Sequence, residues 1–124
     1  MTGHDMKLKR ILAATDFSLL GDAAIHRAAL VAAREDSELL IVHAMPRASV
    51  LDAVFGADRD LAARMRAVAK DRLAVLVDGA KQAGVRRVRV ETPEGSAHRA
   101  LADVAESFHP DLLVIGAHGK GPLQ

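Results

Sequence analysis

Three short and largely apolar runs lie along the chain, and they predict buried strands. They cover residues 11–14, 39–45 and 112–117 and are rich in Ile, Leu and Val. Runs of this length and composition are typical of strands that are covered on both faces. They therefore indicate a parallel sheet with helices on either side.

A fourth segment, residues 85–90, has a different pattern. Val85, Val88 and Val90 are interleaved with arginines. Charged side chains at these positions would be costly if both faces of the strand were covered. We expect this segment to form an edge strand.

Between the strands, apolar residues recur at helical spacing. The three stripes are Ile25, Ala28, Ala29 and Ala32; Leu61, Met65, Ala69, Leu73, Leu76 and Ala80, ending near Gly84; and Ala97, Ala100, Leu101, Val104, Ala105 and Phe108. Residues 46–56 predict a partly apolar loop instead. The order β-α-β-α-β-α-β favours an α/β fold, a doubly wound open parallel sheet with right-handed crossovers and helices on both faces.

The composition fits one domain over residues 1–124, with residues 1–8 expected to be a flexible N-terminus. Half of the residues are hydrophobic, which is enough for a core. Seventeen basic and sixteen acidic residues nearly balance, so no overall field attracts nucleic acid or a membrane. The absence of cysteine and of an apolar leader favours the cytoplasm.

Candidate chemistry follows two of the strands, where ligands of open parallel sheets usually bind. Thr15, Asp16 and Ser18 come after the first strand. Ser18 or Asp22 also fits the N-cap of a helix, whereas Asp16 precedes that helix and is less well explained by capping. We expect Asp16 to lie at the mouth of a crevice.

A glycine-rich turn, residues 116–121, follows the last strand. Its glycines allow a close backbone approach to an anion, and Lys120 adds a positive charge. A tight turn explains the pattern equally well. The turn is not a P-loop, since Val114 and Gly121 stand where that motif needs Gly and Ser or Thr, and no G-x-G-x-x-G follows the first strand.

The six histidines show no metal-binding spacing, and we expect no metal site. His43 fits a neutral core imidazole inside a buried strand. His118, in the glycine-rich turn, fits a phosphate or ribose ligand and a turn cap equally well. No G-x-S-x-G elbow is present, so we expect no enzyme and at most slow, incidental ATP hydrolysis.

Three segments together resemble the universal stress protein family, of the UspA-like kind. They are residues 11–18, 40–44 and 111–119. The resemblance implies a flavodoxin-like, adenine nucleotide alpha hydrolase-like sheet of order 3-2-1-4, with a fifth strand in complete members. It also implies a homodimer that acts in the stress response through an unidentified protein partner and binds ATP or AMP, with or without Mg²⁺.

The resemblance also implies a binding site. Ala14, Thr15 and Asp16 would contact the adenosine, and Ala44 would line the adenine slot. The ribose and phosphates would be held by the last turn, at Gly116, His118, Gly119 and Lys120.

One departure from the family pattern leaves two hypotheses open. ATP-binding members have a further G-[ST] pair beyond this turn, and its position falls after Gln124, as would the fifth strand. The chain is expected to be either a nucleotide-binding stress protein or a dimeric interaction module of the same fold without a nucleotide. A related transferase would need an H-x-G-H motif, which the sequence lacks.

Overall fold

The computed structural model describes residues 7–56 and 59–116, in which strands and helices alternate. The elements are β1 (Arg10–Thr15), α1 (Leu19–Glu35), β2 (Glu38–Val42), α2 (Ala48–Phe55), α3 (Arg59–Ala83), β3 (Arg87–Glu91), α4 (Ala97–Phe108) and β4 (Leu112–Gly116). The α/β class predicted from the apolar runs is confirmed. Before β1, Leu8 already packs against the core.

The four strands of the described residues form one parallel sheet in the order β3-β2-β1-β4. This is the order that the family resemblance implies. The chain moves outward from β1 to β3 and then crosses back to β4 on the other side of β1. The strand order therefore reverses between β1 and β4, which is where ligands collect in such sheets.

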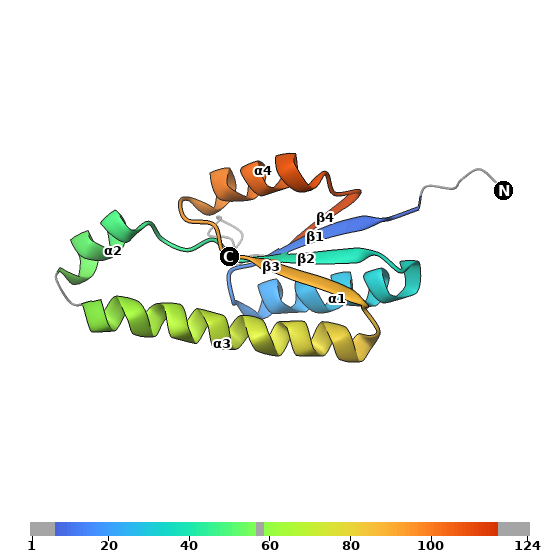
Figure 1. The fold of residues 1–124 in the computed structure, drawn as a ribbon, viewed down its shortest axis with the longest axis horizontal. Helices are drawn as coiled ribbons and strands as arrows, with labels where there is room; N and C mark the ends of the chain where they lie inside the picture. Colours follow the sequence, from blue (N-terminus) through green and yellow to red (C-terminus); the bar gives the residue numbers. More distant parts are fainter. Residues whose placement is uncertain (1–6, 57–58, 117–124) are drawn as a thin grey trace, which may run out of the picture.

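Helices cover both faces of the sheet, as Figure 1 shows, with α4 on one face and α1 and α3 on the other. Successive residues of β1 point to opposite faces. Ile11 packs with α1 and α3, and Leu12 packs with Val104 and Phe108 of α4. The two layers of apolar side chains hold the strand ends in fixed positions.

The apolar stripe predicted for α1 is confirmed, because all four of its residues are buried: Ile25, Ala28, Ala29 and Ala32. Ser18 is the N-cap residue, and its side chain accepts a hydrogen bond of 3.0 Å from Gly21 N. This satisfies one of the helix's unpaired N–H groups. Helix α1 thus begins directly behind the carboxyl end of β1.

The edge position of β3 is also confirmed, since it pairs only with β2 within the described residues. Arginines in and just before β3 reach acidic side chains of neighbouring segments. Arg86 donates two hydrogen bonds, of 3.1 and 2.9 Å, to Asp36, and they lower the pKa of that carboxyl. Arg89 is paired with Glu38 at 3.3 Å.

Two predicted boundaries are wrong. Residues 46–56 do not form a loop throughout, because α2 occupies Ala48–Phe55. The second strand ends at Val42 rather than at residue 45, although Met45 still makes an isolated bridge to Glu94. His43 therefore lies just beyond the strand and is half-buried, not inside a buried strand as predicted.

The prediction that the last strand is covered on both faces is wrong as well. Leu113 and Ile115 of β4 are 44% and 55% exposed. Helix α4 packs over the middle of the sheet, against Leu12 and Leu40, and leaves this face of β4 open in the part of the chain that is described.

Among the helices of residues 7–56 and 59–116, none combines the length and the apolar composition that a membrane span requires.

Candidate functional site

A cavity of about 220 Å³ lies at the carboxyl ends of the central strands, next to the point where the strand order reverses. Its walls come from β1, β2, β4, the segment after β2 and the start of α4. The lining residues are Ala14, Thr15, Asp16, Val42, Ala44, Ala97, His98, Leu101, Ile115 and Gly116.

This cavity brings together the predicted site residues that the structure describes. Ala14, Thr15 and Asp16 from the end of β1 meet Ala44 and Gly116, which follow or end two other strands. The other three predicted residues, His118, Gly119 and Lys120, lie outside the described residues. The ends of β1 and β4 and the segment after β2 therefore meet at one cavity, and the glycine-rich turn that follows Gly116 stays a prediction.

The interior of the cavity is apolar and its rim is polar. Val42, Leu101 and Ile115 supply the larger apolar side chains, while Ala14 and Ala44 leave space between them. Asp16 and His98 are exposed at the same site. Small-molecule sites commonly combine apolar walls with a few polar groups in this way, since the polar groups fix the orientation of the ligand.

The turn between β1 and α1 is held by hydrogen bonds that involve Thr15, which is buried. Its hydroxyl donates to Asp22 Oδ1 and accepts from Phe17 N, both at 2.9 Å. Asp16 Oδ1 accepts a hydrogen bond of 2.9 Å from Ser18 N. The Thr15 hydroxyl thus shapes the turn, and the Asp16 carboxylate is fixed beside the first turn of α1.

Phe17 has a φ of 65°, an uncommon conformation for a residue other than glycine. Its ring stacks on His43 with 3.9 Å between the ring centroids, and Arg72 of α3 lies over it at 4.8 Å. Arg72 also donates a 2.9 Å hydrogen bond to Phe17 O. These contacts stabilise the left-handed backbone of the turn.

His43 completes the support of this turn. Its Nδ1 lies 3.0 Å from Thr15 O, and because the carbonyl can only accept, Nδ1 carries the proton. His43 thus has a structural role at a half-buried position beyond the strand, rather than in the core as predicted.

Two glycines let α1 approach the ends of β1 and β4 closely. A Cβ atom at Gly21 would lie 2.5 Å from Thr15 Oγ1 and 2.7 Å from both Asp16 Oδ1 and Gly116 O. A Cβ atom at Gly116 would collide with the carbonyl of Leu20. The sequence pattern did not indicate Gly21. A side chain at this position would collide with Asp16 Oδ1, so the glycine is needed for the observed position of Asp16.

Sequence reasoning also missed the contribution of α4. Ala97, His98 and Leu101 line the cavity from the first turns of this helix. The signal that could have found them is the topology, because a helix that follows a parallel strand begins at the carboxyl edge of the sheet.

The described residues of this site carry few groups that could act in metal binding or covalent chemistry. In the described ranges, no three His, Asp or Glu side chains come together as metal ligands. Thr15 is the described lining residue that has a hydroxyl group. This hydroxyl is already hydrogen-bonded to Asp22 and to Phe17 N.

The structure is a doubly wound α/β fold with a small cavity at the point where the strand order reverses. The sequence pattern of the universal stress protein family matches residues 7–124. The chain belongs to that family.

One relative is similar to this chain in sequence, and two solved structures are similar to it in fold. The universal stress protein A homolog 1 of Coxiella burnetii is 28% identical over 121 residues, which cover 95% of this chain and 82% of the relative. The structure of UspA from Lactobacillus plantarum is similar at a TM-score of 0.76, with 22% identity, 95% of this chain and 83% of that one. A universal stress protein crystallised in complex with cAMP is similar at a TM-score of 0.65, with 23% identity, 86% of this chain and 70% of that one.

Proposed function

We propose that this protein binds an adenine nucleotide, ATP or AMP, in the cavity at the strand ends and acts in the stress response as a sensor or regulator. The observation that carries the proposal is the meeting of Ala14, Asp16, Ala44 and Gly116 at one cavity. The similar fold of a family member that was crystallised with cAMP supports the same ligand class.

In this proposal the purine lies between the apolar walls, beside Ala44 and Ala14. Asp16 accepts hydrogen bonds from the ribose hydroxyls, since a carboxylate is a strong acceptor for two neighbouring donors. Gly116, His118, Gly119 and Lys120 hold the ribose and phosphates, as the family resemblance implies. We assign no catalytic residue, and any hydrolysis of bound ATP is slow and incidental.

We further propose that the protein works in the cytoplasm as a homodimer and that nucleotide occupancy is reported to a partner protein. Support for self-association comes from Leu113, which is exposed on an edge strand of the described sheet and does not line the cavity. The same exposed face favours the second candidate, a dimeric interaction module that binds no nucleotide. Fractionation of cells that produce the protein tests its location.

The decisive experiment is calorimetric titration of the protein with ATP, AMP and cAMP, each with and without Mg²⁺. We expect one saturable site for at least one nucleotide. Ala44→Phe places an aromatic side chain at the lining of the cavity and should weaken binding at least about tenfold, or ~1.4 kcal/mol.

Ala102→Phe is the matched control, because Ala102 is an exposed residue of α4 that does not line the cavity. It should bind like the wild type. If no nucleotide binds the wild-type protein, or if both variants lose binding equally, the nucleotide proposal is wrong. Absence of binding to the wild type would favour the interaction module.

A further inference from the structure

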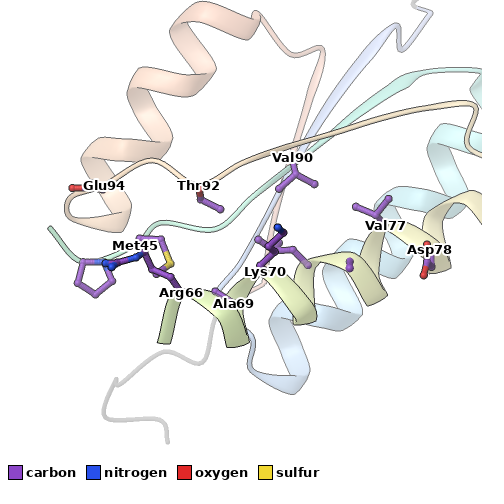
Figure 2. Close-up of a pocket in the computed structure, with 12 residues that line it drawn as sticks. Met45, Arg66, Ala69, Lys70, Val77, Asp78, Val90, Thr92 and Glu94 are labelled. Atoms are coloured by element: carbon purple, nitrogen blue, oxygen red, sulfur yellow. The ribbon is translucent and has the colours of Figure 1, made fainter. Parts of the chain in front are cut away.

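A second and larger cavity, of about 530 Å³, lies between α3 and β3 (Figure 2). It shares no lining residue with the cavity at the strand ends. Its volume falls in the range of small-molecule sites, about 300–1,000 Å³. It forms a groove along the edge of the sheet, and neither the family motifs nor the proposed nucleotide site involves it.

The floor of the groove is apolar. Ala69 and Leu73 of α3 are buried, Val77 is half-buried, and Val90 of β3 is 38% exposed. In Figure 2, Val90 points from β3 toward α3, and Val77 points from α3 toward the strand. A hydrocarbon group in this groove would remove apolar surface on both elements from water, which is favourable.

Two positively charged side chains border this apolar floor. Arg66 and Lys70 are one turn apart on α3, both line the groove, and both are exposed. Within the described residues no ion pair or hydrogen bond involves either side chain, whereas Arg72, Arg86 and Arg89 all have acidic partners. Like charges at this spacing destabilise a helix, so an anion between them is favoured.

Acidic residues restrict which anion fits. Asp78 lines the far end of the groove, eight residues after Lys70, which is about 12 Å along the helix. It would repel a second carboxylate at that end. Glu94 lines the other end, and no ion pair joins it to the two cations in the described part of the chain. The groove therefore fits a ligand with one anionic group and an apolar body.

We propose that this groove binds a medium-length monocarboxylate. Its carboxylate lies between Arg66 and Lys70, and its hydrocarbon chain runs over Leu73 and Val90 toward Val77, ending before Asp78. The site is independent of the nucleotide site. The protein would then bind a carboxylic acid with a hydrocarbon chain at the edge of the sheet, in addition to the proposed nucleotide.

The test is calorimetric titration of the full chain with decanoate, below its micellar concentration. Decanol and the ten-carbon dicarboxylate sebacate are the comparison ligands. We expect one saturable decanoate site, with weaker binding of both other ligands. The double variant Arg66→Gln/Lys70→Gln should bind decanoate about tenfold more weakly, since two exposed ion pairs are lost.

The matched control is Arg27→Gln/Lys81→Gln, which removes the same charge at exposed positions outside the groove. It should bind decanoate like the wild type. A second variant, Ala74→Phe, fills the groove from an exposed position of α3 and should also weaken binding. Decanoate binding should be unchanged by saturating ATP or AMP.

The proposal is overturned if decanoate does not bind, or if decanol binds equally well. It is also overturned if the control double variant loses as much affinity as Arg66→Gln/Lys70→Gln. Competition between decanoate and a nucleotide would place the acid in the cavity at the strand ends and would likewise overturn it. Apart from the competition result, none of these outcomes depends on whether the nucleotide proposal holds.

Discussion

Gly21 and Gly79 are both helical glycines, and their surroundings predict that an added methyl group has opposite effects on the free energy of unfolding. At Gly21 a Cβ atom would meet Thr15 Oγ1, Asp16 Oδ1 and the backbone oxygen of Gly116 at 2.5–2.7 Å. The backbone oxygen cannot move aside without shifting β4. We expect Gly21→Ala to lower the free energy of unfolding by about 1–3 kcal/mol and to weaken nucleotide binding.

Gly79→Ala provides the control, because a Cβ atom there meets nothing within 4 Å and the residue is exposed on α3. It should raise the free energy of unfolding by about 0.4–1 kcal/mol, through a less flexible unfolded chain and a better helix former. Urea unfolding measures both variants. A Gly21→Ala protein as stable as the wild type would mean that α1 does not pack on the strand ends as described.

The polar groups at the strand ends could be predicted from the sequence, but their interactions could not. Thr15 is the last residue of a buried strand and Asp16 directly follows it, and strand ends are where ligands bind in this architecture. The conformation of Phe17, by contrast, depends on Arg72, which is 55 residues away in the chain. No local pattern reports a contact of that kind, because it exists only after α3 has packed.

At the level of elements, the starts of β1 and β4 are joined by one exposed carboxylate. Asp111 Oδ2 accepts hydrogen bonds from Lys9 N and Arg10 N, at 2.8 and 2.9 Å. The bond from Arg10 N and then the bond from Lys9 N lower the pKa of Asp111 below its ordinary value of 3.8. The ionised form is therefore favoured in the folded protein.

A group whose pKa is lower in the folded state stabilises the protein above its unfolded-state pKa. This stabilisation is lost as the pH falls below the ordinary pKa of 3.8 and then through the lower pKa that Asp111 has in the folded protein. We expect Asp111→Asn to reduce the urea midpoint at pH 7. The difference from the wild type should shrink as the pH falls from 4 toward the folded pKa, because the wild-type carboxyl then becomes protonated.

Asp103→Asn removes the same charge from an exposed position of α4 and should change the midpoint little at either pH. A gap between Asp111→Asn and the wild type that stays constant below pH 4 would contradict the role of the ionised carboxylate.

Strands and long helices could be predicted from the sequence more readily than α2. The strands are short apolar runs, and α3 shows a stripe in which Ala69, Leu73 and Ala80 are buried. Helix α2 is eight residues long and lies between Pro46 and Gly56, two residues typical of loops. Its N-cap residue, Arg47, makes no side-chain capping bond, so the usual start signal is missing.

For the whole molecule, the order of the strands followed from the family resemblance, whereas the exposure of β4 did not follow from its composition. An apolar run predicts burial but does not say what covers each face. The two edges of the described sheet differ in chemistry. Strand β3 carries Arg87, Arg89 and Glu91, and charges of this kind protect an edge strand from pairing.

Among the described residues, β4 itself carries no charged side chain, and we therefore expect the homodimer to form through it. Leu113→Lys places a charge on the exposed apolar face of this strand, where association would have to desolvate it. Sedimentation equilibrium should show a dimer for the wild type and a dissociation constant at least about tenfold higher for the variant. Val75→Lys, at a position of α3 that is 70% exposed, is the control and should remain dimeric. A wild-type monomer at high concentration, or equal dissociation of both variants, would show that β4 is not the interface.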